Sequence, residues 1–487
     1  MKPVLTIENS FSIFSENTPD DILNKVQSLL TYKIDIGAEK NALLGKLSYA
    51  KRTGNKKLYN SSLFQLKELE KSEIVCWFKD NSFPTGHLNL VLDLLQNLNI
   101  QINIKDTRSK PKNTILIPFK NKPHTPRYYQ KEMIEKGIET SRGVFESCVG
   151  SGKSLIMLYL IKEISVKSLI IVPSKGLLEQ LYQEFAPIFG VNKVQMLDSD
   201  QVRKGKSLKD IRIITIQSLA SLQKKGELSH LVSDIDALFI DEFHHAASES
   251  FTNLLPEINH IYYRFGFSGT FLRNDGRTLD MWGFLSNRLY HYPPFKAIQE
   301  GFLTPMELRI YDLWGRSSKQ YQKEYDMNYC GGQEILDQII SIINSIKLGE
   351  QVLILVNKKD KSGKIISDFL DLQGYSNIFV SGDDKKEFVS KKIQEFNDKK
   401  ISILIGSSVL GEGIDIRSTD HLIMCQGGKS EIVVVQALGR VVRKFEGKEM
   451  AIVHDFNFVN TNYLSKHFEK RLEIYEKTFK PEIFRVK

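Results

Sequence analysis

A glycine-rich stretch near residue 150 has the residue types and the spacing of a loop that binds phosphates. It reads Ser147-Cys-Val-Gly-Ser-Gly-Lys-Ser154, after a strand-like Gly143–Phe145 segment and before a helical Leu155–Glu163 segment. Glycines let backbone N–H groups close on phosphate oxygens, and the N-terminus of the following helix adds positive potential. A chance Gly-Ser turn is the plainer alternative, and the strand-loop-helix context favours the phosphate loop.

Two side chains at the end of this loop would do the chemistry. Lys153 would reach the β- and γ-phosphates of a nucleoside triphosphate, and the hydroxyl of Ser154 would hold Mg²⁺. The strict form of the motif has glycine at position 147, where this chain has serine. We expect this small residue to be tolerated there.

A pair of carboxylates, Asp241 and Glu242, directly follows the apolar run Ala237–Ile240. Asp241 would hold Mg²⁺ through water, and Glu242 would polarise the water that attacks the γ-phosphate. An acidic helix cap is the alternative, but the position 88 residues after Lys153 argues against it. The loop and the carboxylate pair together predict an enzyme that hydrolyses a nucleoside triphosphate.

A third block, Gln436-Ala-Leu-Gly-Arg-Val-Val-Arg443, contains two arginines three residues apart. That spacing predicts that Arg440 and Arg443 share one face of a helix. Arginines so placed can stabilise the charge that develops on a transferred phosphate. A solvated basic helix is the alternative, which the apolar residues between the arginines disfavour. Upstream of the phosphate loop, Gln130 would read the adenine edge.

Buried parallel strands must position these groups. After residue 127, short continuous apolar runs alternate with longer helical stretches, as in sheets covered by helices on both faces. The predicted strands are Leu169–Val172, Ile211–Ile216, Ala237–Ile240, Val352–Val356, Ile401–Ile405, His421–Met424 and Met450–Val453. We predict an α/β protein with two parallel-sheet lobes, residues 123–300 and 301–460, and a C-terminal helix and tail at 461–487.

The first 122 residues predict a small α+β domain in front of the two lobes. Helical patterns cover residues 63–75 and 87–98, and strand patterns cover Ile100–Ile104 and Thr114–Ile117. Prolines and lysines between residues 110 and 126 then indicate an exposed connector.

The totals limit the class of protein. A chain of 487 residues is too long to fold around a single hydrophobic core. Its longest apolar runs are too short to cross a bilayer. The chain also begins without the basic and apolar segments of a secretion signal. The four cysteines are scattered with no CxxC pair, which argues against a disulfide framework or a zinc ribbon. We expect a soluble, cytoplasmic protein with no membrane partner.

Positive charge is concentrated at the front of the chain. Residues 1–126 contain 18 Lys and Arg and 12 Asp and Glu residues, which is +6 of the total net charge of +9. Five of these basic residues surround Tyr49 and Tyr59, a composition that suits contact with a nucleic acid as well as a solvated face. They are Lys46, Lys51, Arg52, Lys56 and Lys57.

Eight blocks in the chain resemble, in order, the motifs of superfamily 2 DExH helicases. They are Arg127 with Gln130, Gly150–Ser154, Val172–Ser174, Thr215–Ser218, Asp241–His244, Ser268–Thr270, Ile405–Asp415 and Gln436–Arg443. Gly266–Gly276 further resembles the Gly-Leu-Thr-Ala-Thr-Pro-x-Arg-x-Asp-Gly signature of XPB-like and phage UvsW-like DNA helicases, with Ser-Gly-Thr in place of Thr-Ala-Thr. Ala297–Pro305 and the tail around Arg471 and Tyr475 are similar to the same family.

The resemblance implies two RecA-like lobes with ATP and Mg²⁺ between them. The implied catalytic residues are Lys153, Asp241, Glu242, Gln436, Arg440 and Arg443, with Ser154 and Asp241 at the metal. The implied nucleotide contacts are Arg127, Gln130, Gly150, Ser151, Gly152, Lys153, Ser154, Gly413 and Asp415. The implied nucleic-acid contacts are Pro173, Ser174, Thr215, Gln217, Ser407 and Gly411, with Arg273 as the strand-separation residue.

Four functions are compared at this point. The resemblance favours a DNA helicase that unwinds or branch-migrates forked and branched DNA, moving 3′ to 5′, monomeric and phage-encoded, in the bacterial cytoplasm. An RNA helicase would share most motifs, and a binding module with a decayed ATPase would have lost residues that this chain retains. A restriction-enzyme motor is disfavoured because no nuclease arrangement (Pro-Asp…Glu-x-Lys) is evident.

Overall fold

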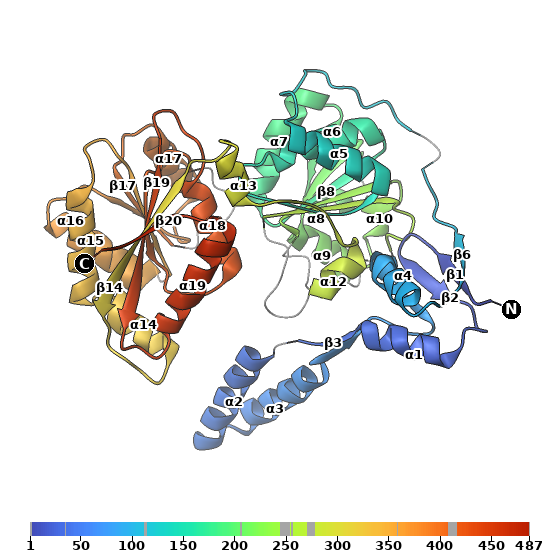
Figure 1. Cartoon of the computed structure of the whole chain (residues 1–487), viewed down its shortest axis with the longest axis horizontal. Coiled ribbons are helices and arrows are strands. Elements are labelled where there is room, and N and C mark those ends of the chain that lie inside the picture. The colour runs from blue at the N-terminus through green and yellow to red at the C-terminus, as the bar shows by residue number, and fades with distance from the viewer. Residues whose placement is uncertain are drawn as a thin grey trace. The chain divides into compact units, whose positions relative to one another are not determined.

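The computed structural model describes residues 2–34, 36–111, 114–204, 207–243, 254, 257–269, 278–357, 359–407 and 416–486 (Figure 1). The chain divides into two compact units. One contains residues 1–146 and 154–290, and the other contains residues 147–153 and 291–487. None of the described helices has the length and apolar character that a membrane span requires.

The first unit is built on a sheet that has seven strands among the described residues. The strand order is β13 (Arg288–Tyr292), β7 (Arg142–Ser147), β12 (Tyr263–Ser268), β11 (Ala237–Asp241), β8 (Ser168–Val172), β10 (Ile211–Thr215) and β9 (Val194–Leu197). All pairings from β7 to β9 are parallel. Every residue of β8, β10 and β11 is buried, as expected of strands covered on both faces.

Helices cover both faces of this sheet (Figure 1). They are α5 (Tyr128–Thr140), α6 (Lys153–Ile164), α7 (Lys175–Phe189), α8 (Ser199–Arg203), α9 (Ile216–Lys224), α10 (Ser229–Val232) and α12 (Thr278–Phe284). Leu169, Ile171 and Ile240 from the strands pack with Leu219 and Phe284 in one apolar core. Because the strands are held in this core, the loops that follow them start from fixed positions at the edge of the sheet.

The N-terminal part of the first unit is a small mixed sheet with two helices. The strand order is β5 (Ser82–Pro84), β2 (Phe11–Phe14), β1 (Val4–Ile7) and β6 (Asn103–Asp106), and the helices are α1 (Asp20–Leu29) and α4 (Leu88–Asn97), which follows a 3₁₀ turn, η1 (Thr85–His87). Leu5, Phe14, Val26 and Leu95 form its core. The predicted α+β domain is confirmed.

A helical hairpin is inserted in this part between the short antiparallel strands β3 (Thr31–Lys33) and β4 (Ile74–Cys76). Its helices are α2 (Gly37–Arg52) and α3 (Lys56–Lys71), which lie side by side (Figure 1). Only Ala50, Ser62 and Leu66 are buried among the described side chains of the two helices. Most of the hairpin surface is therefore open to solvent.

Buried polar contacts attach the N-terminal part to the seven-stranded sheet. The side chain of Asp280 accepts hydrogen bonds from Trp77 Nε1, at 2.8 Å, and from the Tyr32 hydroxyl. Arg264, at the start of β12, is fully buried and donates to Ser10 Oγ at 2.7 Å. Because an unpaired buried guanidinium is costly, this contact favours keeping the two parts together.

The second unit contains another sheet with seven described strands, and all of its pairings are parallel. The order is β16 (Ile378–Val380), β17 (Ile403–Gly406), β15 (Val352–Val356), β18 (His421–Cys425), β19 (Ala451–Val459), β14 (Met306–Trp314) and β20 (Glu482–Val486). Its helices are α13 (Pro294–Gln299), α14 (Tyr321–Tyr329), α15 (Gln333–Ser345), the π-helix η3 (Lys359–Gly363), α16 (Lys364–Leu372), α17 (Lys386–Asn397), α18 (Glu431–Val441) and α19 (Leu464–Thr478). These elements confirm the predicted second parallel-sheet lobe.

A chain of buried polar side chains crosses the second sheet. The Tyr311 hydroxyl is 2.9 Å from His454 Nδ1, and His454 Nε2 is 3.1 Å from His421 Nδ1. His421 Nε2 is in turn 3.0 Å from Glu350 Oε2. Burial lowers the pKa of His421 below its ordinary value and that of His454 well below it. Two neutral imidazoles satisfy the chain if each donates toward Glu350 and accepts from the side of Tyr311.

All seven strands predicted for the two lobes are present, with ends that differ by up to several residues, and the strand predicted at Ile100–Ile104 is found two to three residues later as β6. The predicted strand at Thr114–Ile117 is wrong: these residues lack strand structure, and Ile115 instead donates its N–H to the Ser165 carbonyl at 2.8 Å. Leu116 is exposed and Ile117 is buried, so this segment covers the sheet's helices as an extended connector.

Candidate functional site

The predicted phosphate loop connects β7 to α6. Gly150 and Gly152 have φ angles of 82° and 80°, a left-handed conformation that glycine adopts without a Cβ penalty. Left-handed residues that alternate with the intervening Ser151 turn successive backbone N–H groups toward one concave side, where an anion can bind. Lys153 is the first residue of α6, so its backbone lies at the positive end of that helix.

The serine that replaces glycine at position 147 has a structural role. Ser147 is fully buried, and its Oγ accepts a hydrogen bond from Ser151 Oγ at 3.0 Å. Ser151 also donates its N–H to the Cys148 carbonyl at 3.1 Å. The two serines therefore brace the loop across its base, where a glycine at 147 would offer no side chain.

Asp241 and Glu242 lie where β11 ends. Asp241 is the last residue of that buried strand, and its Oδ1 accepts from the N–H of Glu242 at 3.0 Å. Glu242 has a φ of 47°, an uncommon conformation for a residue with a side chain. Such strain costs about 1–3 kcal/mol and clusters at functional positions. The carboxylate of Asp241 and the hydroxyl of Ser154 are the hard oxygen ligands that Mg²⁺ prefers.

Arg127 and Gln130 form the start of α5. Gln130 Oε1 accepts from the Arg127 N–H at 2.8 Å, which completes a capping box, and Arg127 Nη1 donates to the Tyr129 hydroxyl at 3.2 Å. The side-chain oxygen of Gln130 is thus used by the helix itself.

Pro173, Ser174, Thr215 and Gln217 come together at the ends of two paired strands. Thr215 and Val172 are register partners at the ends of β10 and β8, and Gln217 Nε2 donates to the Pro173 carbonyl at 3.1 Å. Ser174 and Thr215 are the N-cap residues of α7 and α9. Two helix N-termini and two hydroxyls on one edge are suited to gripping phosphates without reading bases.

The arginine block is only partly helical. Arg440 is on α18 and is 5% exposed, but the helix ends at Val441 and Arg443 follows it. The prediction that both arginines share one helix face is therefore wrong. The chain leaves the helix before Arg443, and contacts with Thr304 replace the helical ones. The Val442 carbonyl accepts from the Thr304 N–H at 2.7 Å, and the Arg443 carbonyl accepts from Thr304 Oγ1 at 3.2 Å.

Residues 147–153 belong to the same compact unit as this block. A Cβ placed on Gly439 of α18 would lie 2.7 Å from Val149 Cγ2, so the close approach requires glycine there. A Cβ placed on Gly150 would lie 4.0 Å from Arg443 Cγ. Gln436, half-buried on α18, is one turn before Arg440.

Two further residues, to which the sequence pattern assigned no role, hold the arginine block in place. One is Thr304, through the contacts just described. The other is Lys448, whose mostly buried Nζ donates to the carbonyls of Thr419 and Val441. Burial lowers the pKa of Lys448 to about 8. A lysine in a polar loop shows no sequence pattern that would have identified this contact.

The tail residues Arg471 and Tyr475 have a structural role in the described chain. Arg471 forms a buried bidentate pair with Asp455 of β19, with two N···O distances of 2.8 Å, and Nη1 donates to the Gly428 carbonyl at 2.8 Å. The Tyr475 hydroxyl donates to the same carboxylate at 2.7 Å. These contacts attach α19 to the sheet and to the turn before α18.

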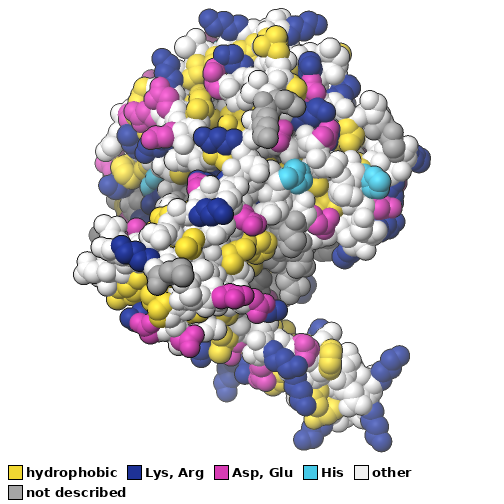
Figure 2. Space-filling view, turned by 90° about the vertical axis from the view of Figure 1, so that its right-hand side faces the viewer, with side chains coloured by type: hydrophobic (Ala, Val, Ile, Leu, Met, Phe, Trp, Pro, Cys, Tyr) yellow, Lys and Arg dark blue, Asp and Glu magenta, His cyan; other side chains and the backbone are white. Residues whose placement is uncertain are grey.

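Several predicted residues lie outside the described part of the chain: His244, Thr270, Arg273, Gly411, Gly413 and Asp415. Ser407 is described and buried, directly after β17. The basic residues of the front domain, Lys46, Lys51, Arg52, Lys56 and Lys57, are exposed on the α2–α3 hairpin. Figure 2 shows Lys and Arg side chains around the hairpin at the lower right.

Comparison with known proteins agrees with this arrangement. Residues 123–273 match the type III restriction enzyme res subunit family, and residues 333–445 match the helicase conserved C-terminal domain. The ATP-dependent DNA helicase uvsW of Enterobacteria phage T4 is 25% identical over 392 residues, which cover 73% of this chain and 76% of that protein. The DNA 3′-5′ translocase XPB2 of Sulfurisphaera tokodaii is 22% identical over 367 residues, 67% and 80% of the two chains.

The chain therefore combines a domain of the type III restriction enzyme res subunit family with a helicase C-terminal domain, and its resemblance to the superfamily 2 helicases is confirmed. A fragment assigned to the HsdR subunit of a type I restriction enzyme from Vibrio vulnificus shares its fold, with a TM-score of 0.58 at 17% identity over 85% of this chain and 76% of that one. The two parallel sheets are RecA-like lobes, and the protein is an ATP-dependent helicase. The phosphate loop and the carboxylate pair lie within the first matched region, and the arginine block lies within the second.

Proposed function

We propose that this helicase acts on DNA and that it unwinds or branch-migrates forked and branched duplexes, moving 3′ to 5′. The observation that carries the proposal is the likeness, over two thirds or more of the chain, to a phage protein named a DNA helicase and to an archaeal protein named a DNA 3′-5′ translocase. Replication, recombination and repair of phage DNA are the processes that require such a motor.

We propose that the first lobe binds and activates ATP. The left-handed glycines at 150 and 152, with Ser151, hold the phosphates, and Lys153 neutralises the β- and γ-phosphates. Ser154 and Asp241 hold Mg²⁺, which supplies charge neutralisation to the phosphates. Glu242 orients the attacking water.

The second lobe supplies positive charge for the transition state. Arg440 and Arg443 neutralise charge on the γ-phosphate, and Gln436, which is on the same helix as Arg440, contacts the nucleotide. Gly413 and Asp415 complete this proposed nucleotide site. The buried position of Arg440 favours a fixed guanidinium, since few rotamers are open to it.

The nucleic-acid strand follows the loops after β8 and β10 in the first lobe and those around Ser407 and Gly411 in the second. In the first lobe Pro173, Ser174, Thr215 and Gln217 contact its backbone, and Arg273 separates the strands. The exposed hairpin residues Lys51, Arg52, Lys56 and Lys57 add contacts to duplex phosphates. Arg52 Cζ lies 5.7 Å from the centre of the exposed Tyr49 ring. The guanidinium and the ring are therefore adjacent on the hairpin surface.

An RNA helicase is the second candidate. A protein of Acanthamoeba polyphaga mimivirus whose name describes an ATP-dependent RNA helicase is 24% identical over 370 residues. Most phosphate-gripping groups would serve either nucleic acid, because backbone contacts carry little information about the sugar.

The deciding experiment measures ATP hydrolysis with no nucleic acid, single-stranded DNA, duplex, forked DNA and RNA. Lys153→Ala is the blank, since it removes the phosphate-binding ammonium. We expect forked DNA to stimulate hydrolysis most strongly. Stimulation by RNA alone would establish the second candidate, and equal stimulation by every substrate would remove the case for a branch-specific motor.

A further inference from the structure

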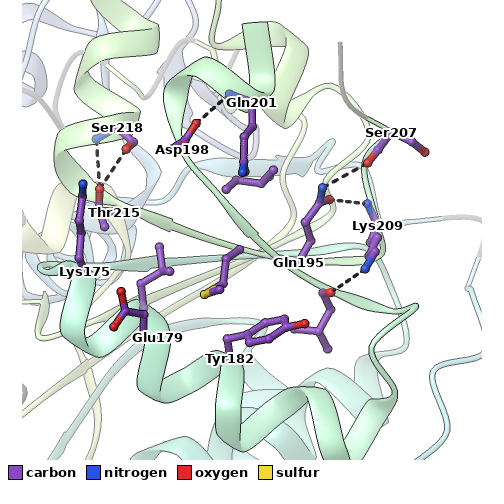
Figure 3. A pocket seen from close by; sticks show the side chains of 14 residues that line it. Lys175, Glu179, Tyr182, Gln195, Asp198, Gln201, Ser207, Lys209, Thr215 and Ser218 are labelled. Carbon is purple, nitrogen blue, oxygen red and sulfur yellow. Dashed lines mark hydrogen bonds between the residues drawn. The ribbon is translucent and has the colours of Figure 1, made fainter. Parts of the chain in front are cut away.

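A groove of about 650 Å³ runs along the edge of the first lobe's sheet. It lies between α7 and the edge strand β9, with Lys175, Glu179 and Tyr182 on one side and Gln195 and Gln201 on the other (Figure 3). Lys175, Glu179 and Tyr182 are spaced four and three residues apart, so they line one face of α7. The volume is within the range of small-molecule sites.

One end of the groove opens at the edge where the proposed phosphate contacts lie. Thr215 and Ser218 line that end, and Thr215 Oγ1 accepts from the Ser218 N–H at 3.3 Å. Lys175 directly follows Ser174, the N-cap of α7. A strand whose phosphates are held by these groups would pass the mouth of the groove.

The walls combine apolar surface with a few amide groups. Leu178, Met196 and Leu197 supply the apolar part, together with the half-buried ring of Tyr182. The amide of Gln195 is already used, since it donates to the Ser207 carbonyl and accepts from the Lys209 N–H. Gln201 differs: its Oε1 is buried, and no donor among the described residues reaches it.

The Oε1 atom is enclosed by protein, but the Gln201 side chain lines the groove and its amide can supply a hydrogen-bond donor there (Figure 3). An amide accepts and donates in one plane, the pattern found along the hydrogen-bonding edge of a nucleobase. An aromatic ring beside apolar side chains supplies a stacking surface, which every base can use. A base has apolar faces and a polar edge, so it matches a groove that has both apolar side chains and amide groups.

We propose that this groove takes a nucleobase turned out from the strand that the first lobe grips. Tyr182 stacks on the base and the Gln201 amide contacts its polar edge, while Thr215, Ser218 and Lys175 hold the adjoining phosphate. The inference rests on the proposed function, because it requires a bound strand. A base in the groove would add affinity that depends on the presence of a base but not on which base it is. The other contacts in this lobe would bind only phosphate.

The test compares two 12-nucleotide single strands, oligo-dT and the same backbone with every base removed. The ratio of their affinities isolates the contribution of the bases. We expect Tyr182→Leu to lower this ratio about 5-fold or more, with the affinity for the abasic strand unchanged. Gln201→Leu should lower it less, and Tyr182→Phe should preserve it because the ring remains. Gln180→Leu, on the outer face of α7, is the matched control.

A direct readout is photocrosslinking of a strand that contains 5-iodouracil, followed by mapping of the attached peptide. We expect Tyr182 among the crosslinked residues. An unchanged affinity ratio in Tyr182→Leu would overturn the proposal. Crosslinking of free 5-iodo-dUMP but not of the strand at Tyr182 would overturn it too, since the base would then come from a free nucleotide.

The two proposals fail in different ways. If the DNA function is wrong, oligo-dT does not bind the wild-type protein, or RNA binds in its place. If only the groove inference is wrong, oligo-dT binds and Tyr182→Leu leaves the affinity ratio unchanged. A base dependence seen only with uridine strands would support the groove and overturn the DNA assignment.

Discussion

Replacing Arg471 by Met would test how the C-terminal helix is attached to the second lobe. Methionine keeps much of the apolar stem but removes the guanidinium that pairs with Asp455. That carboxylate is fully buried, and its remaining partners are the Tyr475 hydroxyl at 2.7 Å and the Phe456 N–H at 2.8 Å. Removing one partner of a buried pair costs about 3–5 kcal/mol, because the other charge stays buried and uncompensated.

Asp455→Asn is the matched second change, since it removes the charge but keeps the shape. Each single variant leaves one buried group without its partner, so both should be destabilised. The double variant contains neither charge and should lose less stability than the sum of the single changes by at least about 2 kcal/mol. This cycle separates the charge pair from the loss of packing.

Hydrogen exchange followed by mass spectrometry resolves the effect by lobe. Amides of β19 that exchange through opening of the second lobe should exchange about two to four powers of ten faster in Arg471→Met. Amides of β8, in the first lobe, are the internal control and should change little. A loss below about 1 kcal/mol, or strict additivity in the cycle, would refute the reasoning, because the pair would then contribute no more than a surface ion pair.

Three further outcomes follow from single groups. Glu242→Gln should bind ATP and the nucleic acid but lose turnover by at least about 100-fold, measured by filter binding and phosphate release; near-normal hydrolysis would contradict its water-orienting role. Because burial holds the pKa values of His421 and His454 below 6.5, the second lobe should lose stability as pH falls below about 6.5, and denaturant titrations of a double Gln variant should show a flatter dependence. Lys448→Met should destabilise the lobe by about 1–3 kcal/mol and lower ATPase activity, since Val441 and Thr419 lose a charged donor; an unchanged melting temperature would show that water replaces it.

Much of the fold could be predicted because its strands are buried on both faces. A run such as Val352–Val356 is apolar throughout, and a covered parallel strand tolerates little else. The strand β14 was missed because its burial alternates along Met306–Trp314, so its sequence mixes charged and apolar residues. Thr114–Ile117 shows the converse error, since a short apolar run can cover a surface without pairing.

The site residues divide in the same way. Phosphate-loop glycines and strand-end carboxylates are recognisable because their function depends on adjacent residues in the chain. Thr304 and Lys448 act through contacts with residues up to 139 positions away, and no local pattern encodes such a partner. The helix end at Val441 was unpredictable for the same reason, because contacts with Thr304 from another segment follow it.

In the proposed mechanism, the parallel sheet of the first lobe connects the ATP site to the nucleic-acid contacts. Asp241 and Thr215 are the last residues of β11 and β10, which flank β8 in the sheet. Neighbouring strands are about 4.8 Å apart, so the backbones at these two positions are separated by about 10 Å. All three strands are fully buried, and a packed core resists bending. In the proposed mechanism, a displacement at Asp241 is transmitted through these packed strands to the loops after β8 and β10.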